Sequence, residues 1–119
     1  MNEGSKYDLY DNISNYHTRD TTEGVKYDDE KLDYTLLDKK SIDEVVKVLM
    51  YGAKKYPAWD NWKKVPDARK RYVKAALRHL MSEADGETID ESGLLHLAHA
   101  ATSCIFAIHF ALQDVEKNY

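Results

Sequence analysis

Three stretches of the chain carry apolar residues at the spacing of an α-helix. The first runs from Ser41 to about Tyr56, and Ser41 with Glu44 has the spacing of a capping box, which predicts that the helix begins at Ser41. Pro57 predicts its end near Tyr56, because the residue before a proline avoids helical dihedral angles. The apolar positions of this helix form one main stripe, Ile42, Val45, Val46, Leu49 and Ala53.

A second helix is predicted from about Asp67 to Ala84, where Gly86 favours its end. A third is predicted from near Ser92 to about Lys117, and it is apolar on nearly all sides. Such a helix is central in a core or is shared with another subunit. The apolar stripe of the second helix consists of Tyr72, Val73, Ala76, Leu77, Leu80, Met81 and Ala84.

These elements predict an all-α fold with three main helices in a thin bundle. The third helix needs more cover than two neighbours provide, so we expect oligomerisation, as a homo-oligomer, to complete the bundle. Residues 1–24 are polar and show no helical or strand period, which predicts a flexible, mostly extended N-terminal arm. Residues 25–119 then form a single helical domain.

Composition and charge exclude several classes of function. The formal net charge of −4 disfavours general nucleic-acid binding, which needs a basic face. No run of about 18 apolar residues is present that would cross a membrane, and the N-terminus lacks the apolar segment of a secretory signal. Cys104 is the single cysteine, so we expect a buried, unreactive thiol and a cytoplasmic location.

Candidate chemistry gathers where the second and third helices meet. His79 and Glu83 lie one turn apart on the second helix, and His96 and His99 lie on one side of the third, with Asp90 in the acidic connector. Imidazoles and carboxylates at this spacing are typical of a metal site, with His79, Glu83, His96 and His99 as ligands. The alternative is that these histidines form ordinary hydrogen bonds at the helix ends. The two histidines of the third helix share their side with Phe106 and Phe110, whereas its main apolar stripe includes Ile105 and Ile108.

A second candidate region, residues 52–64, combines four lysines with aromatic side chains. Aromatic rings stack on bases, and ammonium groups offset the charge of phosphates. The alternative is a polar loop that its two tryptophans attach to the core. The candidate nucleotide-binding residues are Lys54, Lys55, Tyr56, Asn61 and Trp62, together with Arg78 on the second helix.

The ordered motifs resemble one known family. Residues 45–56 (VVKVLMYGAKKY), Asn61-Trp62, residues 75–80 (AALRHL) and residues 86–100 (GETIDESGLLHLAHA) are similar to the N-terminal domain of phage dATP/dGTP diphosphohydrolases. The resemblance covers residues 24–110. It implies an all-helical, oligomeric phage protein in the host cytoplasm that acts on purine deoxynucleotides and releases pyrophosphate. Residues 25–119 would then be a nucleotide-binding domain.

Some members of that family resemble the MazG-type nucleoside triphosphate pyrophosphohydrolases, which hold Mg²⁺ with E-x-x-E and E-x-x-D motifs. This chain differs, since His79-x-x-x-Glu83 and His96-x-x-His99 stand in the corresponding places. Imidazole suits Mn²⁺ or Co²⁺ better than Mg²⁺. The resemblance therefore implies a divalent metal (Mn, Co or Mg), with Glu44, Glu83 and Asp90 as catalytic carboxylates.

Two other functions remain open at this point. The histidines, with Arg78 and Lys55, would bind phosphate without a metal in a non-catalytic, oligomeric sponge. Such a protein would sequester cyclic or other nucleotide immune signals and so evade anti-phage defence. A pure assembly protein, whose histidines only satisfy helix ends, is the third alternative.

Overall fold

The computed structural model describes residues 22–117, and the chain divides into two compact units, Met1–Leu36 and Leu37–Tyr119. The described part of the first unit contains one short 3-10 helix, η1 (Tyr34–Leu36). The second unit contains three α-helices, and the described residues form no strand beyond one isolated bridge, so the all-α prediction is confirmed. The predicted flexible arm, residues 1–24, lies almost wholly outside the described residues.

The first long helix, α2 (Lys39–Lys55), begins earlier than the capping box predicts. Its N-cap is Asp38, whose carboxylate accepts a hydrogen bond from the Ser41 amide at 3.3 Å. Glu44 bonds to Lys47 at 2.6 Å instead of closing a capping box, so that part of the prediction is wrong. The end of α2 at Lys55 agrees with the position of Pro57, and the Tyr56 amide still donates to the Gly52 carbonyl.

The other helices are α3 (Ala68–Ala84), preceded by the 3-10 helix η2 (Asn61–Lys64), and α4 (His96–Lys117). The bounds of α3 match its apolar period. α4 begins later than predicted, because residues before it form a turn closed by an isolated antiparallel bridge between Ile89 and Leu95. Gly93, at φ 84°, takes the left-handed conformation that this turn requires.

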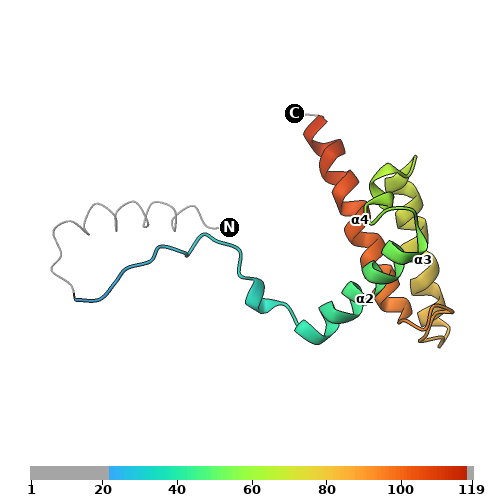
Figure 1. Cartoon of the computed structure of the whole chain (residues 1–119), viewed down its shortest axis with the longest axis horizontal. Coiled ribbons are helices and arrows are strands. Elements are labelled where there is room, and N and C mark those ends of the chain that lie inside the picture. Colours follow the sequence, from blue (N-terminus) through green and yellow to red (C-terminus); the bar gives the residue numbers. More distant parts are fainter. Residues whose placement is uncertain (1–21, 118–119) are drawn as a thin grey trace. The chain divides into compact units, whose positions relative to one another are not determined.

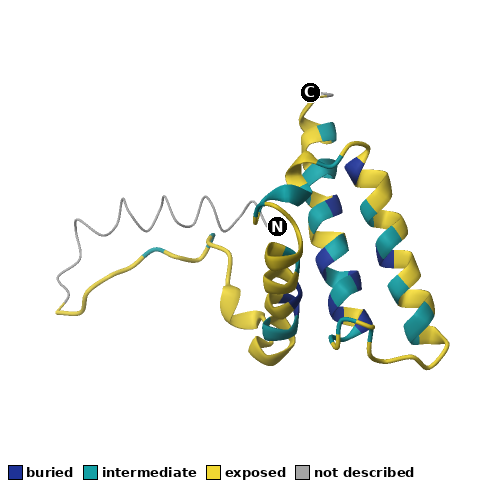
Figure 2. Cartoon of the chain, turned by 45° about the vertical axis from the view of Figure 1, so that its right-hand side comes forward, coloured by how far each residue is buried: buried dark blue, intermediate teal, exposed yellow. Residues whose placement is uncertain are grey.

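α4, coloured orange to red in Figure 1, packs more extensively against α3 than against α2, and in the view of Figure 2 it lies between them. The buried residues of α4 are small apart from His96, while the half-buried ring of Phe106 contacts Tyr72 of α3 and Trp62 of η2. Among the described residues no large side chain is fully buried. The core therefore allows close approach of the helices but buries little apolar surface. The buried residues are Val45, Val48, Ala68, Ala76, Ala98, Ala100 and Ala107, with the polar His96 and Thr102.

Most of the predicted apolar stripes face outward, which corrects the expected orientation of each helix. On α2, Val45 and Val48 point inward, whereas Val46 and Leu49 are exposed. The inward positions are mostly taken by small residues, which permit close helix packing, so the long aliphatic side chains remain on the surface of this chain. Figure 2 shows that each helix is buried along one side and exposed along the other. The exposed stripe residues of α3 are Val73, Leu77, Leu80 and Met81.

On α4 the side that carries the histidines and phenylalanines is inward, and the side with Ile105 and Ile108 is exposed. Cys104 lies on that exposed side, so the expectation of a buried thiol is wrong. Within residues 22–117, no helix has both the length and the apolar character needed to cross a membrane.

Candidate metal and nucleotide site

The connector between α3 and α4 folds back onto the start of α4. The Gly86 amide donates to the Glu83 carbonyl at 2.9 Å with Gly86 at φ 94°, which ends α3 and reverses the chain. The His96 amide then donates to the Thr88 carbonyl at 3.0 Å, and the Asp90 amide donates to the Leu94 carbonyl at 2.8 Å. This double turn carries the Asp90 carboxylate to the place where α3 and α4 meet.

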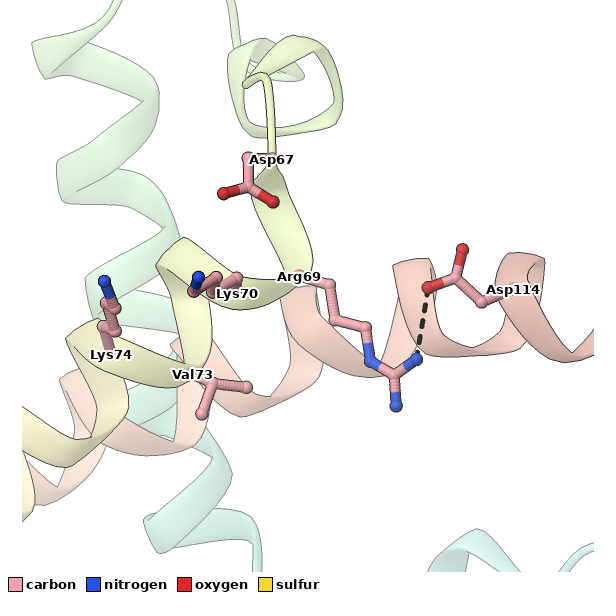
Figure 3. Close-up of a pocket in the computed structure, with 6 residues that line it drawn as sticks. All are labelled: Asp67, Arg69, Lys70, Val73, Lys74 and Asp114. Atoms are coloured by element: carbon pink, nitrogen blue, oxygen red, sulfur yellow. Dashed lines mark hydrogen bonds and ion pairs between the residues drawn. The ribbon is translucent and has the colours of Figure 1, made fainter.

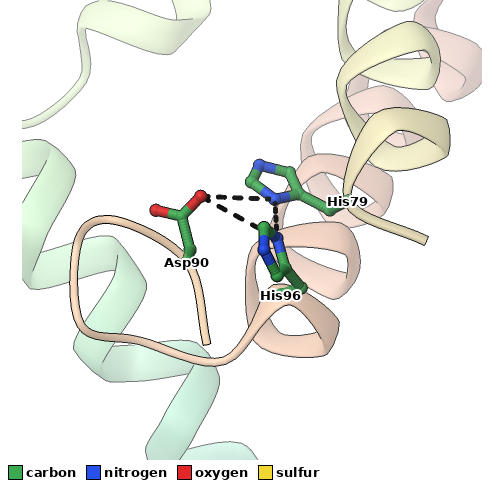
Figure 4. Close-up of side chains that lie close together, drawn as sticks. All are labelled: His79, Asp90 and His96. Carbon is green, nitrogen blue, oxygen red and sulfur yellow. Dashed lines mark hydrogen bonds and ion pairs between the residues drawn. The ribbon is translucent and has the colours of Figure 1, made fainter. Parts of the chain in front are cut away.

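His79 of α3, Asp90 of the connector and His96 of α4 converge there (Figure 4). One ligand atom from each lies within 4.8 Å of the others. The two Nδ1 atoms are 2.9 Å apart, and Asp90 Oδ1 lies 3.9 Å from Nδ1 of His79 and 3.8 Å from Nδ1 of His96. The His96 side chain is 6% exposed and that of Asp90 is 17% exposed. Three side chains from three separate segments thus form one largely enclosed centre.

The hydrogen bond between His96 and Glu87 determines where the protons lie. His96 Nε2 is 3.0 Å from Glu87 Oε1, and a carboxylate only accepts, so Nε2 carries the hydrogen. In a neutral His96 ring, Nδ1 then presents its lone pair toward His79 and Asp90. A carboxylate that holds the far nitrogen of a histidine is the usual support of a metal-binding imidazole.

His99 forms a second layer behind this centre. Its ring stacks on His79 at a centroid distance of 4.6 Å and an interplanar angle of 11°. Its Nε2 lies 2.7 Å from Ser92 Oγ and 3.4 Å from Asp90 Oδ2, and the Ser92 amide donates to the same carboxylate at 2.9 Å. His99 and Ser92 therefore orient both Asp90 and His79.

Burial and charge set the protonation of the cluster. Burial lowers the pKa of His79 and of His99, and the neighbouring imidazoles add to the effect, although Asp90 opposes it. Burial raises the pKa of Asp90, but hydrogen bonds from Ser92 and the nearby imidazoles outweigh it, so this pKa lies below its usual range. Both shifts of the imidazole pKa favour neutral rings at His79 and His99, and the lowered pKa of Asp90 favours an ionised carboxylate, which is the combination that binds a cation.

Glu83 supplies an independent sign that the site accommodates something more. Its Oε2 atom is buried and has no hydrogen-bond partner in residues 22–117. A buried carboxylate oxygen without a partner is costly unless a cation or a proton donor reaches it. Glu83 lies one turn from His79, on the same side of α3. The group that could hold a cation consists of His79, His96 and Asp90, and two imidazoles with a carboxylate suit a borderline divalent cation.

The lysines at the end of α2 lie on the His99 side of the centre. The Tyr51 ring meets His99 edge-on at a centroid distance of 6.2 Å, and the Lys55 ammonium lies 5.8 Å from the Tyr51 ring. The charge of Lys55 also contributes to lowering the pKa of His99. Lys54 lines a shallow depression with Tyr51, Ser92, Lys47, Met50 and Leu94. Two predicted phosphate ligands, Lys54 and Lys55, are therefore adjacent to the cluster.

Other predicted residues lie elsewhere. Trp62 stacks on Phe106 at 4.2 Å with an interplanar angle of 7°, so it packs within the helical unit. Asn61 is half-buried at the start of η2, and Tyr56 is exposed just after α2. Arg78 is exposed on α3 but close enough to the cluster for its charge to contribute to lowering the pKa of His79. Glu44 is paired with Lys47.

Sequence reasoning missed Glu87, Ser92 and Tyr51. The Asp90-x-Ser92 spacing, which suits an Asx turn, was the available signal for Ser92. Nothing comparable marks Glu87 or Tyr51, because their roles depend on how the connector and α2 pack against α4.

A wider depression of about 500 Å³ lies between the start of α3 and the end of α4 (Figure 3). Arg69 on its wall is paired with Asp114 at 3.1 Å, and Lys70 and Lys74 complete its basic side. It is at the far end of α3 from His79 and contains no imidazole.

The chain is similar to known proteins of one family. The sequence profile of a family described as "dATP/dGTP diphosphohydrolase, N-terminal" matches residues 21–119. A protein of Salmonella phage PMBT28, named "dATP/dGTP diphosphohydrolase", is 36% identical over 84 residues, which is 70% of this chain and 28% of that protein. The chain thus spans little more than a quarter of that relative's length. No solved structure matches the chain.

Proposed function

The chain belongs to the family of N-terminal domains of dATP/dGTP diphosphohydrolases, and from that premise we propose that it hydrolyses purine deoxynucleoside triphosphates at the histidine cluster. The products are a deoxynucleoside monophosphate and inorganic pyrophosphate. The observation that carries the proposal is the convergence of His79, Asp90 and His96 within 4.8 Å. Packing alone does not require two imidazoles and a carboxylate from three segments to share one enclosed place.

The residues at this place fit a divalent cation. His79 Nδ1, His96 Nδ1 and an Asp90 oxygen would hold it. A donor set with two imidazoles favours Mn²⁺ or Co²⁺ over Mg²⁺. When bound, such a cation lowers the pKa of a water molecule and offsets charge on phosphoryl oxygens.

The remaining steps belong to the side chains. Water attacks the α-phosphorus, its proton passes to Glu83, and the bond between the α-phosphorus and the bridging oxygen breaks. The electron pair of that bond leaves with the bridging oxygen, as part of inorganic pyrophosphate. Lys54 and Lys55, beside Ser92 and Tyr51, hold the β- and γ-phosphates, and the exposed Tyr56 ring stacks on the purine.

A second candidate function is binding without hydrolysis, as in a nucleotide sponge. The observation that favours it is the small number of carboxylates, since Asp90 is the one carboxylate in the group of His79, Asp90 and His96 that could hold a cation. In that case Glu83 is structural, and the ligand leaves the protein unchanged.

The test is to incubate the protein with dATP and dGTP, with and without Mn²⁺, Co²⁺ or Mg²⁺, and to separate products by ion-exchange chromatography. Formation of deoxynucleoside monophosphate and inorganic pyrophosphate is expected only when a metal is present. Asp90→Asn should abolish turnover, whereas Asp85→Asn, the same change at an exposed connector position, should not. Retention of unchanged nucleotide supports the sponge. No nucleotide-dependent change in melting temperature and no product would reject both functions.

A further inference from the structure

Trp59, in the loop between α2 and η2, is 71% exposed. A tryptophan is usually well covered in a folded protein, because the indole offers a large apolar surface. The loop is nevertheless held by hydrogen bonds. The Asn61 amide donates to the Ala58 carbonyl at 3.1 Å, and the Lys63 amide donates to the Asp60 carbonyl at 2.9 Å. A hydrogen-bonded turn therefore presents this ring to the solvent.

The two tryptophans of this turn have opposite surroundings. Trp62 is half-buried and stacks on Phe106 of α4, so it attaches the turn to the helical unit. The ring of Trp59 remains largely uncovered. The Lys63 ammonium lies 5.4 Å from the Trp59 ring and 5.5 Å from the Trp62 ring. Trp59 thus combines an accessible aromatic face with a neighbouring positive charge.

A second exposed ring of the same loop also has a lysine beside it. Tyr56 is 48% exposed, and the Lys55 ammonium lies 5.5 Å from its ring. Accessible aromatic rings with adjacent cations are typical of surfaces that stack on nucleobases and offset phosphate charge. Trp59 follows Tyr56 by three residues, so their Cα atoms are at most about 11 Å apart. Both rings can therefore reach one base.

The loop begins beside the histidine cluster. The Lys55 ammonium lies 5.8 Å from the Tyr51 ring, and that ring meets His99 edge-on. Trp59 follows Lys55 by four residues, which limits the separation of their Cα atoms to about 14 Å. A nucleoside triphosphate with its phosphates at Lys55 can therefore extend its base to Trp59.

We propose that the indole of Trp59 stacks on the base of the bound nucleotide, with Tyr56 on the other face, and so selects purines over pyrimidines. This inference rests on the proposed function, because it concerns the nucleotide bound at the same site. The fused rings of a purine cover more of an indole than the single ring of a pyrimidine does. Stacking strength sets base preference where the base is not read by hydrogen bonds. The lysines do not discriminate, since every nucleotide carries phosphates.

The test measures nucleotide affinity of the full chain by equilibrium dialysis at a fixed Mn²⁺ concentration. The ligands are the α,β-methylene analogues of dATP and dCTP, which resist cleavage at the α-phosphorus. The wild type should bind the dATP analogue more tightly than the dCTP analogue. Trp59→Ala should bind the dATP analogue about tenfold more weakly and lose most of that preference, whereas Trp59→Phe, which keeps a ring, should retain most of the affinity. Tyr34→Ala is the matched control, because Tyr34 is also 71% exposed, and it should bind as the wild type does.

Tryptophan fluorescence supplies a second readout. The chain contains two tryptophans, and Trp62 is packed against Phe106. The dATP analogue should therefore quench the wild-type emission mainly through Trp59, and Trp59→Phe should lose most of this quenching although it still binds. Unchanged affinity for the dATP analogue in Trp59→Ala, or equal quenching in the wild type and Trp59→Phe, would overturn the inference.

The outcomes also separate this inference from the proposed activity. Binding that depends on Trp59, without any product from dATP, would reject the hydrolysis and leave the stacking in place. Hydrolysis of subsaturating dATP at the same rate in the wild type and Trp59→Ala would reject the stacking and leave the hydrolysis in place. A wild type that binds neither analogue would also overturn the inference.

Discussion

The hydrogen bond between Glu87 and His96 offers the sharpest test of the proposed cation site, through the variant Glu87→Ala. His96 is almost fully buried, and Glu87 Oε1 lies 3.0 Å from its Nε2. Removing the carboxylate leaves the ring without the partner that holds its Nε2 hydrogen and directs Nδ1 toward Asp90. Loss of such a partner typically weakens metal binding about 10–100-fold.

The exposure of Glu87 decides where in that range the effect should fall. Its side chain is 63% exposed, so water can replace the lost carboxylate oxygen at Nε2. We therefore expect about a tenfold loss, close to 1.4 kcal/mol. Asp90→Asn should lose more, because it removes a ligand and not its support.

The assay is titration of the metal-free protein with Mn²⁺ at pH 7.5, with free ion counted by electron paramagnetic resonance. Glu91→Ala is the matched control, since it removes the same charge from an exposed position of the same connector. Equal losses in the two variants would mean that Mn²⁺ responds only to the general negative charge. Unchanged affinity in Glu87→Ala would refute the assignment of His96 as a supported ligand.

Three further outcomes follow from the structure. Asp38→Ala should lower the free energy of unfolding by about 1 kcal/mol in urea denaturation, because Asp38 and not Ser41 is the N-cap of α2; a larger loss from Ser41→Ala would restore the capping box. Trp62→Ala should lower the free energy of unfolding by about 3 kcal/mol, because it removes the contact with Phe106, whereas Tyr56→Ala should weaken nucleotide binding and leave the melting temperature nearly unchanged. Weaker nucleotide binding in Trp62→Ala, with unchanged stability, would instead place the purine ring at Trp62. The metal-free protein should lose stability between about pH 7 and pH 5, because the pKa values of His79 and His99 are lower in the folded than in the unfolded chain, and the unfolded state therefore binds more protons as the pH falls. Thermal melts of His79→Gln should depend less on pH than those of the wild type, and an equal dependence would contradict the argument that burial lowers the His79 pKa.

The bounds of α3, the end of α2 and the meeting of the histidines could be predicted from the sequence, because they depend on local geometry, whereas the predicted starts of α2 and α4 were wrong by a few residues. The spacing of apolar residues predicts both ends of α3, and Pro57 predicts the end of α2. The short connector forces the end of α3 to lie near the start of α4, so His79 and His96 are close in any compact arrangement. The identity of the ligand partners was less accessible, since Glu87 and Ser92 reach the cluster only through the turns of residues 85–95.

Only the tertiary structure decided which side of each helix faces the core. An apolar period locates the apolar side of a helix, but it does not distinguish burial within one chain from burial against another chain. Here the close approach of α4 to α2 and α3 selects alanines and valines such as Ala76 and Val48 for the inside. The larger aliphatic side chains, Leu77 and Ile108 among them, lie on the outward sides, because small residues and the packed rings of Tyr72 and Phe106 already occupy the positions between the helices.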